Sequence, residues 1–407
     1  MHANTPPCHV ASVGTRRVFL VLAVWALAIL SGAVSASSAS AAEGWRWQGS
    51  AAVESAYDSN VFHLSDAAKH RVDRQDPVDR ANGRIRDMES VDDFIFSPRL
   101  AVGGESKNRF GSFSIVPRAE YHFHIKNDAK NYPDIGLELR QTLPGHSVVT
   151  FDADVELGVF KKNYLEGTTV PGEVSADQRI YGPGIYDDYA VALEWERRLW
   201  RSNDRIPRVG VPSKLTGSFE TTYTKRRFHD FSNRNLDVFG GRALLATSSG
   251  EWVKLDLAYR FDYRAAPGGS EVVIIDEPAL GSDLTGDADA LDQNVSTTTN
   301  VDRSRFQHEI RVKLRGDPTR RLRATVAYEY MLMNYLSDEP LDLGHNGRID
   351  NQHVIGGGLR WEFRESWYAG VKSKYSIRES NESFSQLEED DPNKSGWTTG
   401  LSLTRSF

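Results

Sequence analysis

The sequence predicts an all-β fold: one transmembrane antiparallel β-barrel of about 14 strands, with short periplasmic turns and long extracellular loops. Three observations predict it. The chain begins with the pattern of an export signal, its interior alternates apolar and polar residues over long stretches, and the connections between these stretches alternate between short and long.

The first 41 residues have the layout of a secretory signal peptide. Arg16 and Arg17 precede an apolar run over 18–30, and small residues follow as far as Ala41. The run is shorter than the roughly 20 residues that a membrane-spanning helix needs, and the small residues are typical of a cleavage site. We therefore predict a signal peptide over 1–41 and an outer-membrane barrel over 42–407.

Composition argues against several classes of function. Cys8 is the only cysteine and lies in the signal, so the mature chain has no thiol for a disulfide, a nucleophile or a metal. The formal charge of −7 becomes −9 when Arg16 and Arg17 are removed, which disfavours nucleic acid as a partner. The sequence contains no phosphate-binding glycine loop and no dinucleotide fingerprint, and we predict no cofactor.

The interior of the chain alternates apolar and polar residues, as a strand with one apolar face does. From Phe113 to Ile125 every second residue is apolar, with Arg118 and Glu120 among those between. Such strands of about ten residues match a tilted membrane crossing, whereas soluble sandwiches use about five or six. The eighth strand is the weakest, because glycines blur its alternation. The predicted strands span 45–57, 93–105, 110–125, 132–143, 147–160, 187–199, 214–223, 237–247, 252–263, 305–315, 322–332, 352–363, 367–377 and 395–407.

The connections between these strands alternate in length, which is typical of a barrel with two unequal ends. Only 200–213 is long for a short end, and 126–131 is brief for a long end. Aromatic residues also gather near strand ends, as interfacial girdles do. The short connections are 106–109, 144–146, 248–251, 316–321 and 364–366, and the long ones are 58–92, 161–186, 264–304, 333–351 and 378–394.

Two short segments carry a resemblance to known proteins. The last strand ends in Phe407, which resembles the terminal signature read by the outer-membrane barrel assembly machinery and implies that machinery as a partner. Tyr57-Asp58-Ser59-Asn60-Val61-Phe62 resembles the start of β-barrel porins found among polysaccharide-export proteins. The resemblance implies a Gram-negative outer-membrane location but does not fix a substrate.

Charges on the predicted inward faces fall on two sides of the barrel. Opposed walls put a field across a pore that orients dipolar solutes and admits small ions. The alternative interpretation is that the charges pair and stiffen the barrel. The predicted acidic wall consists of Glu138, Asp152, Asp154, Glu156 and Glu194, and the predicted basic wall of Arg311, Lys313, Arg315, Arg323, Arg360 and Lys372.

The leading hypothesis is therefore an outer-membrane pore for passive diffusion of ions or small hydrophilic solutes, in contact with outer-membrane lipid and lipopolysaccharide. Two alternatives stay open. One is the outer-membrane component of an export system for polysaccharide or another polymer. The other is a non-conducting structural or adhesion barrel. The acidic connection 264–304 is a candidate plug.

Few residues along the chain have a spacing that suits catalysis or metal binding. His146-Ser147 are adjacent, so on a strand they point to opposite faces and cannot act as a base and nucleophile pair. Asp187-Asp188 and His229-Asp230 are similar to the acidic and histidine pairs of outer-membrane aspartyl-type proteases, but their spacing differs. His122 and His124 share a face without an evident third metal ligand, and the acidic run 283–292 fits a solvated loop better than a calcium loop. We predict neither an enzyme nor a metal site.

Overall fold

The computed structural model describes residues 44–64, 66–168, 179–201, 213–249, 252–266, 268–276, 294–339, 342, 345–381 and 394–406. The predicted signal peptide, the acidic run 283–292 and Phe407 lie outside these residues, so the predictions made for them remain predictions. None of the helices within the described ranges is long and apolar enough to cross a membrane.

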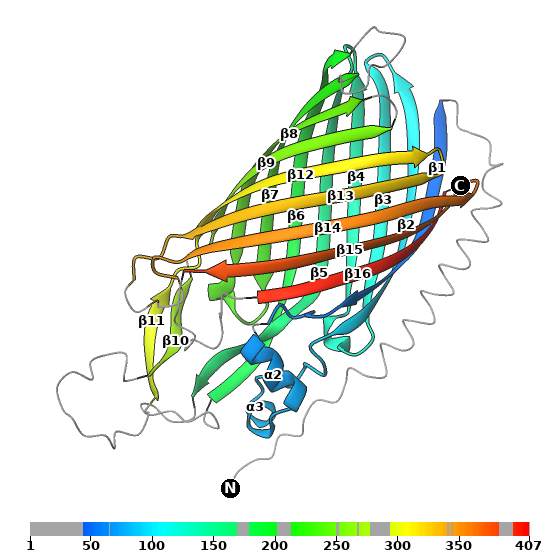
Figure 1. The fold of residues 1–407 in the computed structure, drawn as a ribbon. Helices are drawn as coiled ribbons and strands as arrows, with labels where there is room; N and C mark the ends of the chain where they lie inside the picture. The colour runs from blue at the N-terminus through cyan, green and yellow to red at the C-terminus, as the bar shows by residue number, and fades with distance from the viewer. Residues whose placement is uncertain are drawn as a thin grey trace.

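Fourteen of the described strands close into one antiparallel barrel (Figure 1). Each pairs with its neighbour in sequence, except that β9 pairs with β12 and that β1 pairs with β16 to close the ring. The predicted fold class is confirmed. The strands are β1 (Trp45–Asp58), β2 (Asp93–Asn108), β3 (Gly111–His124), β4 (Tyr132–Leu143), β5 (Ser147–Thr168), β6 (Arg179–Arg201), β7 (Lys214–Phe228), β8 (Leu236–Ser249), β9 (Val253–Ala265), β12 (Arg305–Thr319), β13 (Leu322–Tyr335), β14 (Ile349–Arg364), β15 (Trp367–Ser380) and β16 (Lys394–Ser406).

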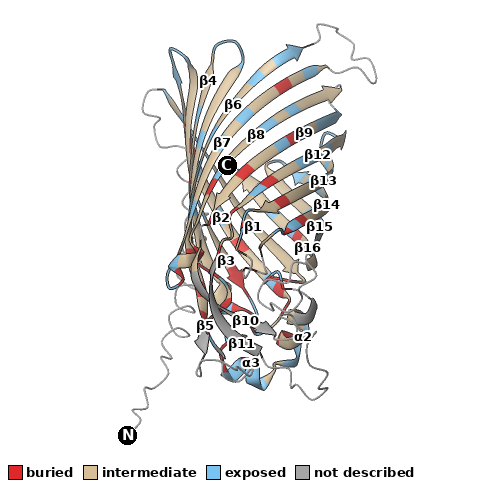
Figure 2. Ribbon diagram, turned by 90° about the vertical axis from the view of Figure 1, so that its left-hand side faces the viewer, coloured by how far each residue is buried: buried red, intermediate tan, exposed pale blue. Residues whose placement is uncertain are grey.

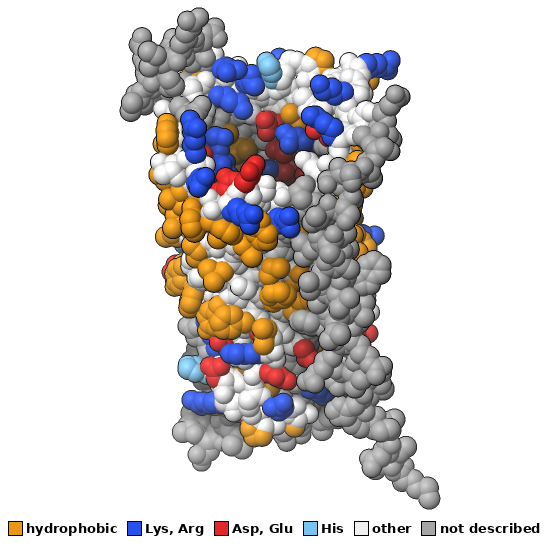
Figure 3. All heavy atoms as spheres, turned by 90° about the vertical axis from the view of Figure 1, so that its right-hand side faces the viewer, with side chains coloured by type: hydrophobic (Ala, Val, Ile, Leu, Met, Phe, Trp, Pro, Cys, Tyr) orange, Lys and Arg blue, Asp and Glu red, His pale blue; other side chains and the backbone are white. Residues whose placement is uncertain are grey.

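The outward face of the barrel is apolar. On β12 the side chains of Ile310, Val312 and Leu314 are 48%, 38% and 49% exposed, while the residues between them carry charge and face the lumen. A belt of hydrophobic side chains crosses the middle of the face shown in Figure 3, and charged side chains lie toward both ends. A closed ring leaves no unpaired strand edge, and apolar side chains outside suit lipid. The predicted outer-membrane type of barrel is confirmed.

Two strands are longer than the alternation predicts. The expected strands 147–160 and 187–199 are observed as β5 (Ser147–Thr168) and β6 (Arg179–Arg201). Their pairing shifts register near Gly158, whose φ is +67°, and again after Phe160. Each bulge resets which face a side chain occupies, and the alternation of the outer half therefore cannot be read from the sequence.

The connection expected as a loop over 58–92 begins after Asp58 and forms, over 59–92, a small helical cap at the end with the long connections. It contains α2 (Asp66–Arg74) and α3 (Pro77–Ala81), and Asp76 caps α3 by accepting hydrogen bonds from the main chain. The cap packs on the outer half of β5, and the buried residues in Figure 2 gather at this end. Its core consists of Val61, Phe62, Leu64, Val72, Ile85, Met88, Val91 and Phe160.

The connection 264–304, the candidate plug, contains a separate hairpin of β10 (Gly269–Asp276) and β11 (Asn294–Val301). In Figure 1 the hairpin lies beyond the rim, at the same end as α2 and α3. The alternation over 269–276 and 294–301 is short, and these strands were not predicted. Residues 277–293 of this connection lie outside the described residues, so the plug stays a prediction. The cap residues Asn60 and His63 line a cavity at this end of the barrel, together with Arg303 and His345 from other connections.

Candidate functional site in the barrel lumen

The predicted wall residues all project from the inner face of the barrel. Cross-strand pairs such as Glu138↔Asp152 and Arg323↔Arg360 put them on the face opposite the lipid-exposed residues. The acids lie on β4, β5 and β6, and the bases on β12 to β15. In the strand order, β4 to β6 are half-way round the ring from β13 to β15. The predicted acids therefore lie on three adjacent strands and the predicted bases on four adjacent strands, of which β13 to β15 are across the ring from the acids.

A row of carboxylates crosses the acidic wall. It includes the predicted Glu156, whose neighbours Asp134 on β4 and Asp188 on β6 stand directly beside it in the register. Arginines close both ends of the row: Arg99 lies 2.5 Å from the next acid, and Arg226 lies 2.5 Å from Asp188. The full row is Arg99, Glu120, Asp134, Glu156, Asp188 and Arg226.

Closer to the short connections, the acids of the acidic wall form ion pairs with arginines on neighbouring strands. Arg118 on β3 forms an ion pair with Asp154 and a 3.6 Å pair with Asp152. Gly136 lies between them on β4, and a Cβ there would collide with the Arg118 guanidinium and the Asp154 carboxylate. Glycine therefore allows Arg118 to reach across a strand. Glu194 likewise lies 3.7 Å from a guanidinium, that of Arg242.

The basic wall is less completely paired. Arg311 lies 3.9 Å from Glu329, Arg323 lies 2.9 Å from Asp317, and Lys372 pairs with Glu54. Arg360 stacks over the ring of Tyr368 at 4.1 Å. Lys313 and Arg315 form no ion pair with any described residue. Pairing and an open charged surface thus coexist, at different positions of the lumen.

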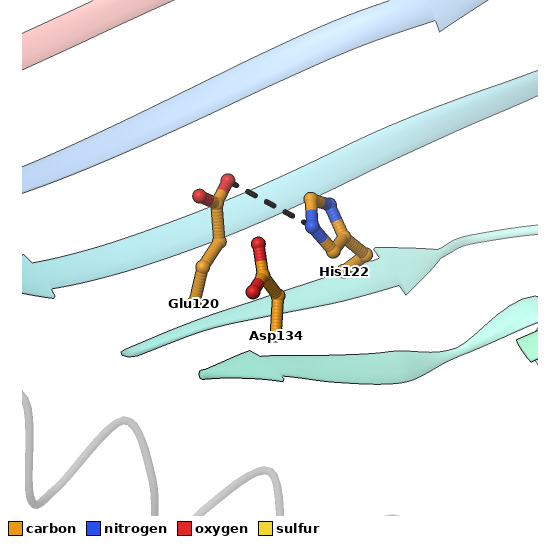
Figure 4. Close-up of side chains that lie close together, drawn as sticks. All are labelled: Glu120, His122 and Asp134. Atoms are coloured by element: carbon orange, nitrogen blue, oxygen red, sulfur yellow. Dashed lines mark ion pairs between the residues drawn. The ribbon is translucent and has the colours of Figure 1, made fainter. Parts of the chain in front are cut away.

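One group has the residue types of a metal site. Glu120, His122 and Asp134 bring one ligand atom each within 4.8 Å of one another (Figure 4). Asp134 comes from the neighbouring strand, which is why the sequence shows no third ligand beside His122. Arg99 neutralises Glu120 at 2.5 Å, and Ser97 hydrogen-bonds the ring of His122 at 3.0 Å. Glu120 and His122 therefore have partners in the described lumen wall, whereas the Oδ1 atom of Asp134 is buried and has no hydrogen-bond partner there.

Two further sets of candidate residues lie near the ends of strands, where they form structural contacts or a turn. His229 lies 3.3 Å from Asp187, which also accepts a 2.8 Å hydrogen bond from the main chain of Gly158. Asp188 accepts hydrogen bonds from Nε and Nη2 of Arg226, at 2.9 and 2.5 Å. His146 sits in a turn with φ +63°, one residue before β5 begins.

The cap brings titratable groups into the outer mouth, which we define as the lumen at the end with the long connections. Two cavities lie at this end of the barrel, and His63 lines each of them. Desolvation lowers the pKa of His63 to about 4, Asp58 opposes the shift and nearby lysines reinforce it, so the ring is neutral at pH 7. Lys130, in the connection between β3 and β4, lies beside the cap. Burial lowers the pKa of Lys130 to about 8, and its ammonium donates to the Phe160 carbonyl at 3.1 Å and lies 4.9 Å from the Phe62 ring.

The basic residues of the outer mouth were missed by the sequence analysis. They include Arg226, Arg264, Arg305, Arg348 and Arg378. They come from four strands and one connection, and no spacing along the chain relates them. Their position near strand ends, beside the long connections, was the one available signal.

No protein-family model and no curated protein matches the chain. Solved structures that it is similar to include the outer membrane channel DcaP of Acinetobacter baumannii, with 10% identity and a TM-score of 0.40 over 89% of this chain and 97% of that one. An anion-selective porin from Comamonas acidovorans has 10% identity and a TM-score of 0.35, over 89% and 99% of the two chains. A bacterial polysaccharide outer membrane secretin has 9% identity and a TM-score of 0.36, over 88% and 98%. At these values the likenesses carry no argument about function.

Proposed function

We propose that the protein is a passive outer-membrane pore through which ions or small hydrophilic solutes diffuse. The observation that carries the proposal is the pair of opposed charged walls on the inner face of a closed barrel. A lumen with no conducting role could be lined by neutral or fully paired residues. Here Lys313 and Arg315 face it without an ion-pair partner among the described residues.

The proposal assigns no catalytic step to the chain. The carboxylate of Asp188 is neutralised by Arg226, and His146 lies in a turn beside its would-be partner Ser147. The lumen charges instead act at a distance: they attract counter-ions and repel co-ions in a region where protein replaces part of the surrounding water. Phe407 as the residue that the barrel assembly machinery reads, and lipopolysaccharide as a contact of the outer surface, belong to the same proposal.

Single-channel recording in a planar bilayer tests the pore directly. We expect the mature barrel to show open steps, and the variant Arg311→Gln/Lys313→Gln/Arg323→Gln to shift the permeability ratio toward cations, on the order of twofold or more, because three positive charges leave one wall. The matched control is Lys107→Gln/Arg109→Gln/Arg320→Gln, which removes the same charge from exposed residues at the end of the barrel with the short connections.

An unchanged ratio in the lumen variant, or an equal shift in the control, would contradict selectivity by the basic wall. A well-folded barrel without steps would contradict the pore itself. Steps that appear only after the cap is removed would favour the export alternative, in which an outer gate opens for a polymer.

A further inference from the structure

The outer mouth contains a cavity of about 410 Å³ with a strongly basic wall. Asp58 is the one acidic side chain among its described lining residues, although the whole chain carries a net charge of −7. The sign of the charge is therefore reversed locally. The basic side chains that line the cavity are Lys161, Arg226, Arg234, Arg264, Arg303, Arg305, Arg348, Lys374, Arg378 and Lys394.

Four of these residues form what we call the arginine cluster: Arg264, Arg305, Arg348 and Arg378. Arg264 on β9 and Arg305 on β12 stand directly opposite each other in the strand pairing, on the lumen side. Like charges at directly opposed positions destabilise a sheet. An anion bound between the two guanidinium groups would offset this repulsion.

The cluster is held in place by one phenol and one carboxylate. Arg305 donates to the Tyr335 hydroxyl at 2.8 Å and Arg378 donates to the same oxygen at 2.9 Å. Arg348 donates to the fully buried Asp350 at 2.9 Å, and Arg378 pairs with that carboxylate too. One carboxylate thus serves two of the four guanidinium groups, and neither Arg264 nor Arg305 lies within ion-pair distance of a described carboxylate.

Hydrogen-bond donors also remain unused at the cavity wall. The Nε atoms of Arg264 and Arg305 are both buried and have no hydrogen-bond partner among the described residues. A buried donor without an acceptor costs free energy. An oxyanion in the cavity would supply the missing acceptor and the missing negative charge together.

We infer that the arginine cluster is a binding site for small solutes that carry two or more carboxylate or phosphate groups. The inference rests on the proposed pore function and names the class of solute that the pore takes up at its outer mouth. Guanidinium groups bind carboxylate and phosphate oxygens through paired N–H bonds. One anionic group can join Arg264 and Arg305, and a second can reach the other bases of the wall. The cavity volume falls within the range of small-molecule sites.

Isothermal titration of the purified, full mature barrel in detergent at low ionic strength tests the site. The probes are citrate, pyrophosphate and neutral sucrose. We expect saturable binding of citrate, pyrophosphate or both, and none of sucrose. The two anions separate carboxylate from phosphate chemistry. In Arg264→Gln/Arg305→Gln the affinity should fall by about tenfold or more, because the two guanidinium groups without a carboxylate partner among the described residues are lost.

Two further variants keep the test independent of folding. Arg320→Gln removes one positive charge at the opposite end of the barrel and should bind like the wild type. Arg305→Lys keeps the charge but loses the paired N–H groups, and should bind more weakly than the wild type but more tightly than the double variant. The double variant should also withstand heat at least as well as the wild type without anion, because it relieves like-charge repulsion.

Absence of saturable binding to both anions in a heat-resistant wild-type barrel would overturn the site, and so would equal affinity in the double variant. These outcomes leave the pore untouched if the bilayer steps are normal. Conversely, binding without conductance would reject the pore and keep the site.

Discussion

Asn60 fixes the way the chain leaves β1. Its amide donates to the carbonyl oxygens of Leu64 at 2.7 Å and Ser395 at 3.2 Å, and its oxygen accepts from the Leu64 main chain at 2.8 Å. Asp58 accepts from the Asn60 main chain at 2.8 Å, and Val61 and Phe62 enter the cap core. The segment that resembles the start of β-barrel porins thus turns the chain into the cap and ties it to β16.

Asp92 provides a test of rim electrostatics. Hydrogen bonds from Lys126 at 2.6 Å and from Ser90 lower the pKa of Asp92 to about 2, aided by the Tyr57 hydroxyl. A lowered folded-state pKa stabilises the fold above the unfolded value of about 3.9, and the contribution is lost as the pH falls toward 2. We therefore expect Asp92→Asn to lower the unfolding temperature at pH 7, and the difference from wild type to shrink below about pH 4.

Heat-modified gel mobility, measured from pH 2 to pH 7, would follow this difference. Asp73→Asn, an exposed carboxylate on α2, is the control and should not change the midpoint. Equal midpoints of Asp92→Asn and wild type at pH 7 would rule out a stabilising role for this carboxylate.

At the scale of elements, the cap depends on a core separate from the barrel. Phe160 and Val72 are each 1% exposed, and Phe160 meets Phe62 edge to face at 6.0 Å. Phe160 lies beyond the first register shift of β5, so its side chain serves the cap while the earlier part of the strand serves the barrel. One strand therefore takes part in two structural units.

Phe160→Ala should loosen the cap and leave the barrel closed. Truncation of a buried phenylalanine typically costs about 3–5 kcal/mol, and here the loss falls on the cap. We expect faster protease cleavage within 59–92 and a larger single-channel conductance. Phe151→Ala is the matched control, since Phe151 lies on the same strand and faces lipid. If both variants are cleaved at the wild-type rate, the cap is held by other contacts.

At the scale of the whole molecule, the alternating faces of the strands decide where the protein resides. Val191 on β6 is 41% exposed and faces outward, whereas the next residue, Ala192, faces the lumen beside Asp152. The two residues are adjacent in sequence, but the side chain of Val191 faces outward and that of Ala192 faces the lumen. Lipid on one side and aqueous solution on the other is the arrangement that a closed membrane barrel requires.

Arginine at these two positions should therefore have opposite consequences. Val191→Arg places a charge against lipid and should cost about 2–4 kcal/mol if the site lies near the bilayer midplane. Ala192→Arg places the same charge in the lumen next to Asp152 and should be tolerated. Urea unfolding of barrels in lipid vesicles measures both, and equal midpoints for the two variants would contradict the assigned faces.

Sequence patterns predicted most of the barrel. The alternation from Phe113 to Ile125 matches β3, and even the weakly patterned stretch 237–247 forms the regular strand β8. The division into acidic and basic walls was also predicted, because inward residues of successive strands stay on one side of the ring. The cap, the outer half of β5 and the hairpin of β10 and β11 were not, since their order depends on bulges and on contacts between distant segments.

Outside the bulged outer half of β5 and β6, the sequence by itself determined which residues face lipid and which face the lumen, because the two-residue period of a strand is a local property of the chain. Only the tertiary structure decided which inward residues meet. The heights of Arg264 and Arg305, or of Glu120 and Asp134, are set by the register between strands and by the closure of the ring. Register depends on all the pairings together, and no spacing within one strand encodes it.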